Sequence, residues 1–117
     1  MKTTKKQFTL FKREIKSNIK LYGLMDWDVI IEHVQAGARS IATTVPELES
    51  RIVVFSLNTN ILMDSALTDK DIKEVALHEV LELRFTKLED MVCKSMKTAA
   101  REEVHALIQT FININRS

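Results

Sequence analysis

The chain has 117 residues, of which 45% are hydrophobic and 28% charged, with one cysteine, two glycines and one proline. This composition is typical of a folded protein, and the length predicts a single domain over residues 1–117. A lone cysteine excludes an intrachain disulfide framework, and the absence of an apolar run near 18 residues excludes a transmembrane helix. Because the N-terminus lacks the apolar stretch of a signal peptide, we expect a cytoplasmic protein without a membrane partner.

The net charge of +1 conceals an uneven distribution along the chain. Residues 1–20 include seven basic residues and one acidic residue, Glu14, so this segment carries a charge of +6. The remainder has ten basic and fifteen acidic residues, a charge of −5. A basic first helix can bind nucleic acid, but it can equally be a solvated face balanced within the molecule. No pattern of alternating basic and aromatic residues continues beyond it, so we expect at most weak nucleic-acid binding.

The first segment of the chain is predicted to be a helix. Its apolar residues recur at spacings of three and four, which places them on one face of a helix. They are Phe8, Phe11, Ile15, Ile19 and Tyr22. Glycine readily adopts the left-handed conformation in which many helices end, so Gly23 predicts the C-terminal boundary.

Three short strands are predicted next. Residues 27–34 alternate in polarity as a half-buried strand does, and a turn at residues 36–37 leads to a second strand over residues 40–45. Pro46 is expected to end that strand, because proline has no N–H to donate to a neighbouring strand. Residues 51–57 are apolar on both faces and should form the most buried strand. This spacing predicts a small antiparallel or mixed sheet.

The C-terminal half is predicted to be helical. Thr68 and Asp71 have the spacing of a capping box, which starts a helix from about Asp69 to Phe85. A second helical piece should cover residues 86–96, and a last helix should run from Thr98 to Ile114. The expected inner face of that last helix consists of Val104, Leu107, Ile108, Phe111 and Ile114. One helix, three strands and further helices predict an α+β fold.

The stretch with the clearest chemistry runs from Glu74 to Glu82, with the sequence Glu-Val-Ala-Leu-His-Glu-Val-Leu-Glu. On a helix, His78 and Glu82 lie one turn and about 40° apart, so both can bind one cation. The rest of this helix is almost entirely apolar, which predicts burial. A buried histidine or carboxylate is costly unless it finds a partner, and a metal ion is one such partner. The alternative is that His78 and Glu82 pair with Lys or Arg side chains.

Glu79 follows the histidine and points about 100° away from it on the helix. It can therefore reach a metal-bound water without binding the metal, as the glutamate does in the His-Glu-x-x-His helix of zinc peptidases. Here Glu82 replaces the second histidine, and two His with one Glu is an established catalytic zinc ligand set. That set requires a further histidine on another element.

The chain offers two histidines besides His78. His105, on the last helix, is the better candidate for the third zinc ligand, whereas His33 is predicted to be a half-buried residue of the sheet. Glu103, on the opposite flank of the last helix, is the alternative third ligand. Glu102 is expected to face solvent, and it can orient the His105 ring without itself binding the metal.

Four segments follow one another in a recognisable order. They are Tyr22-Gly-Leu-Met-Asp-Trp-Asp-Val29, Arg51-Ile-Val-Val-Phe-Ser-Leu-Asn58, Ala76-Leu-His-Glu-Val-Leu-Glu-Leu83 and Glu103-Val-His-Ala-Leu-Ile108. In this order the chain resembles small zincin-like proteins of phages and mobile elements, akin to the minigluzincin metallopeptidases. The resemblance implies an N-terminal helix, a small twisted sheet, an active-site helix and a final helix that bears a ligand. It also implies zinc-dependent hydrolysis of a peptide or protein substrate, in the host cell cytoplasm if the protein is phage-encoded.

The resemblance assigns roles to individual residues. His78 matches the first zinc ligand and Glu79 the general base. Glu82 stands where the family has its second histidine, and His105 lies on the helix that normally supplies the glutamate ligand. The ligand types are thus exchanged between two helices. Two alternatives remain open, namely a zincin-like domain that binds metal or a partner without cleavage, and a small protein whose basic first helix binds nucleic acid or another phage protein.

Overall fold

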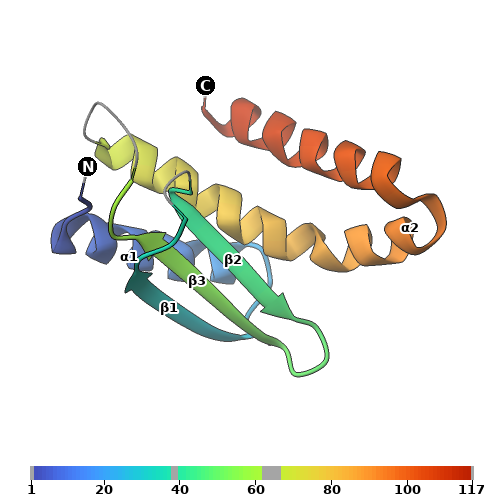
Figure 1. The fold of residues 1–117 in the computed structure, drawn as a ribbon, viewed down its shortest axis with the longest axis horizontal. Coiled ribbons are helices and arrows are strands. Elements are labelled where there is room, and N and C mark those ends of the chain that lie inside the picture. Colours follow the sequence, from blue (N-terminus) through green and yellow to red (C-terminus); the bar gives the residue numbers. More distant parts are fainter. Residues whose placement is uncertain (1, 38–39, 62–66, 117) are drawn as a thin grey trace.

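The computed structural model describes residues 2–37, 40–61 and 67–116, and it describes their side chains except at 87–101, 104, 115 and 116. A helix, three strands and a long helix follow one another (Figure 1): α1 (Lys5–Leu21), β1 (Asp28–Val34), β2 (Ala42–Glu47), β3 (Ile52–Asn58) and α2 (Asp69–Arg116). The fold is therefore α+β, as the sequence predicts.

Local signals fix both ends of α1. At its start, the Thr4 hydroxyl accepts from the Gln7 N–H at 3.1 Å and the Gln7 side chain accepts from the Thr4 N–H at 2.9 Å, which is a capping box. At its end, Gly23 has a φ of +70° and the Leu24 N–H bonds the Ile19 carbonyl at 2.9 Å. This is the left-handed helix ending that Gly23 predicts.

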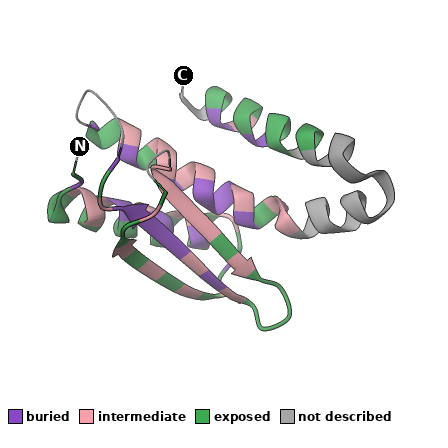
Figure 2. Ribbon diagram, viewed as in Figure 1, coloured by how far each residue is buried: buried purple, intermediate pink, exposed green. Residues whose placement is uncertain are grey.

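The three strands form a mixed sheet in the order β1-β3-β2. β1 pairs with β3 in parallel, and β2 pairs with β3 antiparallel. The central strand β3 is the most buried of the three, as predicted from its apolar sequence (Figure 2). Both β1 and β2 are edge strands, and within the described parts of the chain each has one side without a strand partner.

The prediction that Pro46 ends the second strand is wrong, because Pro46 lies within β2 opposite Val53. The Asn58 N–H bonds the Ile41 carbonyl at 2.9 Å. Since backbone groups alternate in direction along a strand, Ile41 and the odd-numbered residues after it turn toward β3, and even-numbered residues turn toward the free edge. Pro46 thus lacks an N–H on the side where no partner strand needs it.

The main core lies between the sheet and the two helices, which cover one face of it (Figure 1). β3 contributes Val53, Phe55 and Leu57, each with no exposed surface. The buried face of α1 and that of α2 meet these residues, and α2 contributes Ile72, Ala76, Val80 and Leu83. This face of α2 fixes which way the remaining residues of the helix point.

The helix α2 folds back on itself (Figure 1). A straight helix of its 48 residues would be about 72 Å long, whereas the longest dimension of the molecule is 41 Å. We call residues 69–86 the first arm and residues 102–114 the return arm. The sequence predicts three separate helical pieces here, and the structure instead assigns one continuous helix. No helix in the described parts of the chain is both long and apolar enough to cross a membrane.

The return arm packs through a narrower face than predicted. Ile108 and Ile112 are buried against Leu81 of the first arm, whereas Leu107 and Ile114 are 49% and 68% exposed. Phe111 is half-buried and lies edge-to-face with Tyr22, with ring centroids 5.9 Å apart. The expected inner face is thus wrong for Leu107 and Ile114, and the side chain of Val104 lies outside the described residues. The return arm therefore carries more apolar residues than it buries against the first arm.

Candidate metal centre

The first arm of α2 begins with the capping box that the sequence predicts. The Thr68 N–H bonds the Asp71 carboxylate at 2.8 Å, and the Asp71 N–H bonds the Thr68 hydroxyl at 3.1 Å. The helix then buries its apolar face in the core, as its nearly continuous apolar sequence predicts. With that face fixed, the histidine and the two glutamates of the motif lie on the side that faces β2 and the return arm.

These three residues form one group. One ligand atom from each of His78, Glu79 and Glu82 lies within 4.8 Å of the other two. His78 Nε2 and Glu82 Oε1 are 3.2 Å apart, and both side chains are about one-third exposed, at 36% and 30%. Among the described residues, no other group of three His, Cys, Asp or Glu has this spacing. The predicted pairing of His78 with Glu82 across one helical turn is therefore present.

Glu79 is more deeply placed than its two neighbours, with only 6% of its surface exposed. The hydroxyl of Thr44, on β2, donates a short hydrogen bond to the Glu79 carboxylate, and it also lies 3.2 Å from the Glu79 backbone carbonyl. The buried carboxylate thus has a partner on a different element.

The environment separates the pKa values of the three groups. Burial raises the pKa of Glu79 to about 7, against a lowering by the Thr44 hydrogen bond. The hydrogen bond to His78 lowers the pKa of Glu82, and the same bond raises the pKa of His78. The pKa values of the two carboxyl groups, Glu79 and Glu82, are therefore shifted in opposite directions. Such a difference is found in sites where one carboxyl group exchanges a proton and the other stays charged.

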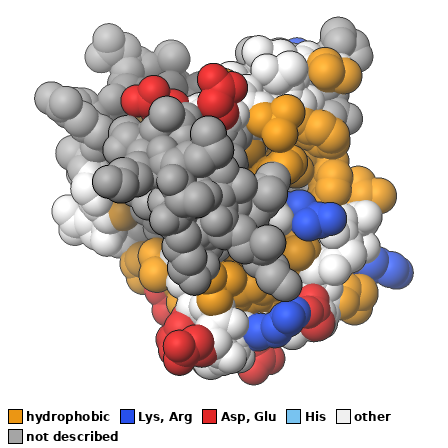
Figure 3. Space-filling model, turned by 90° about the vertical axis from the view of Figure 1, so that its right-hand side faces the viewer, with side chains coloured by type: hydrophobic (Ala, Val, Ile, Leu, Met, Phe, Trp, Pro, Cys, Tyr) orange, Lys and Arg blue, Asp and Glu red, His pale blue; other side chains and the backbone are white. Residues whose placement is uncertain are grey.

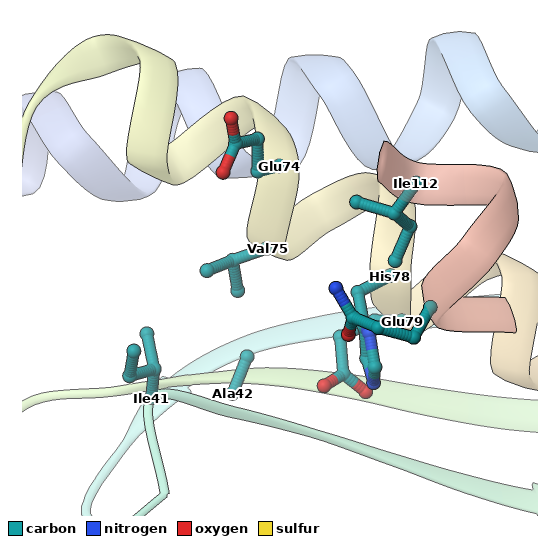
Figure 4. A pocket seen from close by; sticks show the side chains of 8 residues that line it. Ile41, Ala42, Glu74, Val75, His78, Glu79 and Ile112 are labelled. Carbon is teal, nitrogen blue, oxygen red and sulfur yellow. The ribbon is translucent and has the colours of Figure 1, made fainter. Parts of the chain in front are cut away.

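A pocket of about 330 Å³ opens beside the group. Figure 4 shows His78 and Glu79 close together between the helix and the strands, with Ile112 of the return arm near them. Ile41, which precedes β2, and Ala42, its first residue, line the pocket together with Val75 of the first arm. Glu74 and Gln109 complete the lining. The pocket therefore has an apolar part next to the two titratable side chains, as binding sites for organic ligands commonly do.

The other predicted site residues lie outside this group. His105, Glu102 and Glu103 are all exposed on the return arm. His105 still acts on the group at a distance, because its charge contributes to the lowered pKa of Glu82. His33 is a half-buried sheet residue, as predicted, with Nε2 2.6 Å from the Thr3 hydroxyl and its ring stacked on Phe8.

Sequence reasoning missed Thr44 and the pocket lining. The sequence predicts only that Thr44 lies on a strand, and its contact with Glu79 spans 35 residues of sequence. No local sequence pattern predicts such a contact, because the contact depends on how β2 packs against α2. Comparison of the chain with known protein families and with curated proteins finds no match.

Proposed function

We propose that this protein is a zincin-like, zinc-dependent peptidase in which His78 and Glu82 bind the metal and Glu79 is the general base. The observation that carries the proposal is the His78–Glu79–Glu82 group, which lies next to the buried apolar face of the helix and at the edge of a pocket. One imidazole and two carboxylates are ligand types that zinc accepts. The 3.2 Å between His78 Nε2 and Glu82 Oε1 is close to the roughly 3.4 Å that separates two ligands around a tetrahedral zinc.

A catalytic zinc site requires a third protein ligand and an open position. We propose His105 for the third ligand, because it lies one turn before Ile108, through which the return arm packs against Leu81 of the first arm. Glu79 is the competing choice, since its carboxylate already belongs to the group. The two choices make opposite predictions for zinc content when either residue is replaced, and that comparison is set out in the Discussion.

In a site of this kind zinc supplies Lewis-acid chemistry, since it makes water more acidic and polarises a peptide carbonyl. The protein residues do the remaining work. Glu79 accepts the proton of the attacking water and delivers it to the leaving amine. Its burial beside an apolar wall keeps competing water away from that carboxylate. His78 and Glu82 stay fixed by the helix, so the reacting groups need little rearrangement.

The free edge of β2 suits an extended peptide substrate. The backbone N–H and C=O groups of Ala42 and Thr44 turn toward that edge, as the pairing of Ile41 with Asn58 requires. A peptide can add there as a further strand. Pro46 has no N–H, so regular pairing must end there. The edge thus offers a short docking segment directly beside Glu79.

A peptide-library digest read by mass spectrometry tests the proposal. Zinc-loaded parent protein should cleave, and Glu79→Gln should retain zinc but lose about 10²–10⁴-fold in turnover, as expected for a lost general base. Chelator-treated parent is the control for metal dependence. Cleavage that survives both treatments would contradict the proposal. A zinc-loaded parent that cleaves no member of the library supports the alternative, a zincin-like domain that binds metal without cleavage.

A further inference from the structure

Thr44 is the residue that joins the edge of the sheet to the candidate general base. Its side chain lies on the helix-facing side of β2, in register with the fully buried Phe55. The Thr44 hydroxyl has a single proton, and the Glu79 carboxylate is the stronger of its two acceptors. The hydroxyl therefore fixes one carboxylate oxygen of Glu79.

Glu79 has few other restraints on its carboxylate. Its neighbours His78 and Glu82 belong to the same helical arm; both act on Glu79 through their charges, and Glu82 also accepts a hydrogen bond from the protonated Glu79 carboxyl. In the proposed function both of them bind zinc, and so neither is available to orient a base. Thr44 is the contact from a second element, and it is made through a short, rigid, β-branched side chain.

We propose that Thr44 is a positioning residue that holds the Glu79 carboxylate in place for proton transfer. This inference rests on the proposed function, because it gives Glu79 the role of general base. Thr44 also turns its backbone N–H and C=O toward the free edge of β2. A peptide strand bound at that edge would therefore pair with the same residue that orients the base, which sets the register between substrate and Glu79.

Two adjacent threonines provide a matched test. Thr44→Val removes the hydroxyl with little change in shape, and Thr44→Ser keeps the hydroxyl. Thr43→Val makes the same change on the opposite face of the sheet, where Thr43 pairs with Ser56. Each zinc-loaded variant is compared with the parent for kcat and KM, after its zinc content and folded state are checked by elemental analysis and circular dichroism.

A loss of positioning should appear in kcat. For Thr44→Val we expect kcat to fall about 10–10²-fold, as misplaced catalytic groups do, with KM within about twofold of the parent. Thr44→Ser should restore most of the lost rate, and Thr43→Val should match the parent. A Thr44→Val variant with the kcat of the parent would overturn the inference, as would a Thr44→Ser variant as impaired as Thr44→Val.

A second readout does not depend on activity. In metal-free protein at alkaline pH, the carboxyl carbon signal of Glu79 in NMR spectra should move in Thr44→Val and stay in place in Thr43→Val. An unmoved signal in Thr44→Val would show that the hydroxyl does not hold the carboxylate and would overturn the inference. If the zinc-loaded parent cleaves nothing, the proposed function and this catalytic role fail together, while the NMR signal still decides whether Thr44 binds Glu79.

Discussion

Glu79 is a carboxylic acid buried beside an apolar wall, and this placement has a consequence for stability. Its pKa is raised to about 7 by burial, from 4.5 in an unfolded chain. Between pH 4.5 and 7, Glu79 therefore keeps its proton in the folded metal-free protein, whereas in the unfolded chain it has lost that proton. The stability associated with protonated Glu79 is full below pH 4.5 and is lost as the pH rises through about 7.

His78 and Glu82 change stability in opposite directions. The pKa of His78 is raised by its hydrogen bond to Glu82, so its stabilising effect is present below pH 6.5 and is lost as the pH rises through the folded value. The pKa of Glu82 is lowered by the same bond, so its effect is present above pH 4.5 and is lost in acid. Between pH 5 and 8, Glu79 and His78 both predict a falling stability.

Glu79→Gln should remove the part of this pH dependence that Glu79 causes. In chelator-treated protein we expect the variant to resemble the parent near pH 5 and to be more stable at pH 8, by on the order of 2 kcal/mol. Urea unfolding at the two pH values measures the difference. Glu47→Gln, at an exposed position of β2, is the matched control and should keep the pH dependence of the parent. A Glu79→Gln variant that loses stability between pH 5 and 8 as steeply as the parent would contradict the assignment.

At this scale the sequence predicts contacts within one element and misses contacts between elements. The His78–Glu82 pair and the Thr68–Asp71 capping box follow from spacing on a helix, and both are present. The hydrogen bond from Thr44 to Glu79 depends on the register of β2 and on the distance between β2 and α2. No local sequence pattern predicts either of these. The prediction that His105 binds the same metal ion as His78 and Glu82 likewise depends on how the return arm packs, which spacing along the helix does not specify.

Among the elements, α1 has the most uneven charge. Lys5, Lys12, Lys16 and Lys20 are exposed on it, whereas Phe11 is buried and Phe8 is half-buried against His33. The helix therefore presents cations to solvent without an exposed aromatic ring on which a base could stack. Figure 3 shows one side of the molecule, where Lys and Arg side chains border a broad area of exposed hydrophobic side chains.

Binding of nucleic acid by α1 should be weak and strongly dependent on salt. Four phosphate contacts would lose about 10²-fold in affinity between 50 and 200 mM salt. Fluorescence anisotropy with labelled single- and double-stranded DNA measures this, and Lys12→Glu combined with Lys16→Glu is the variant that should abolish it. Tight binding at high salt, or selectivity for one sequence, would contradict the prediction and favour a nucleic-acid-binding protein.

The sequence predicts the end of an element correctly where a local signal ends it. It fails where the end depends on how a strand pairs within the sheet. Gly23 marks the end of α1 because a left-handed residue is needed there. Pro46 was expected to end β2, but an edge strand tolerates proline when its nitrogen faces away from the partner strand. The parallel pairing of β1 with β3 joins strands separated by β2 in sequence, and hydrophobic alternation within each strand does not specify such an order.

For the whole molecule, the α+β fold brings three parts of the chain to one site. The core between the sheet and the helices orients α2, which places the His78–Glu79–Glu82 group toward β2. The return arm closes the pocket through Ile112 and brings His105 within electrostatic reach of Glu82. Apolar patterning predicts the buried face of the first arm, but it could not predict which strip of the return arm is in contact.

The central claim is that His78 and Glu82 bind zinc, and the zinc content of protein purified without added metal tests it most directly. Elemental analysis should find about one zinc per chain in the parent and none at stoichiometric level in His78→Ala. His33→Ala, which removes a histidine outside the group, is the control and should retain the metal. If His105 is the third ligand, His105→Ala should lose zinc and Glu79→Gln should keep it, and the reverse would assign that place to Glu79. Absence of zinc from the parent, or an unchanged zinc content in His78→Ala, would contradict the account.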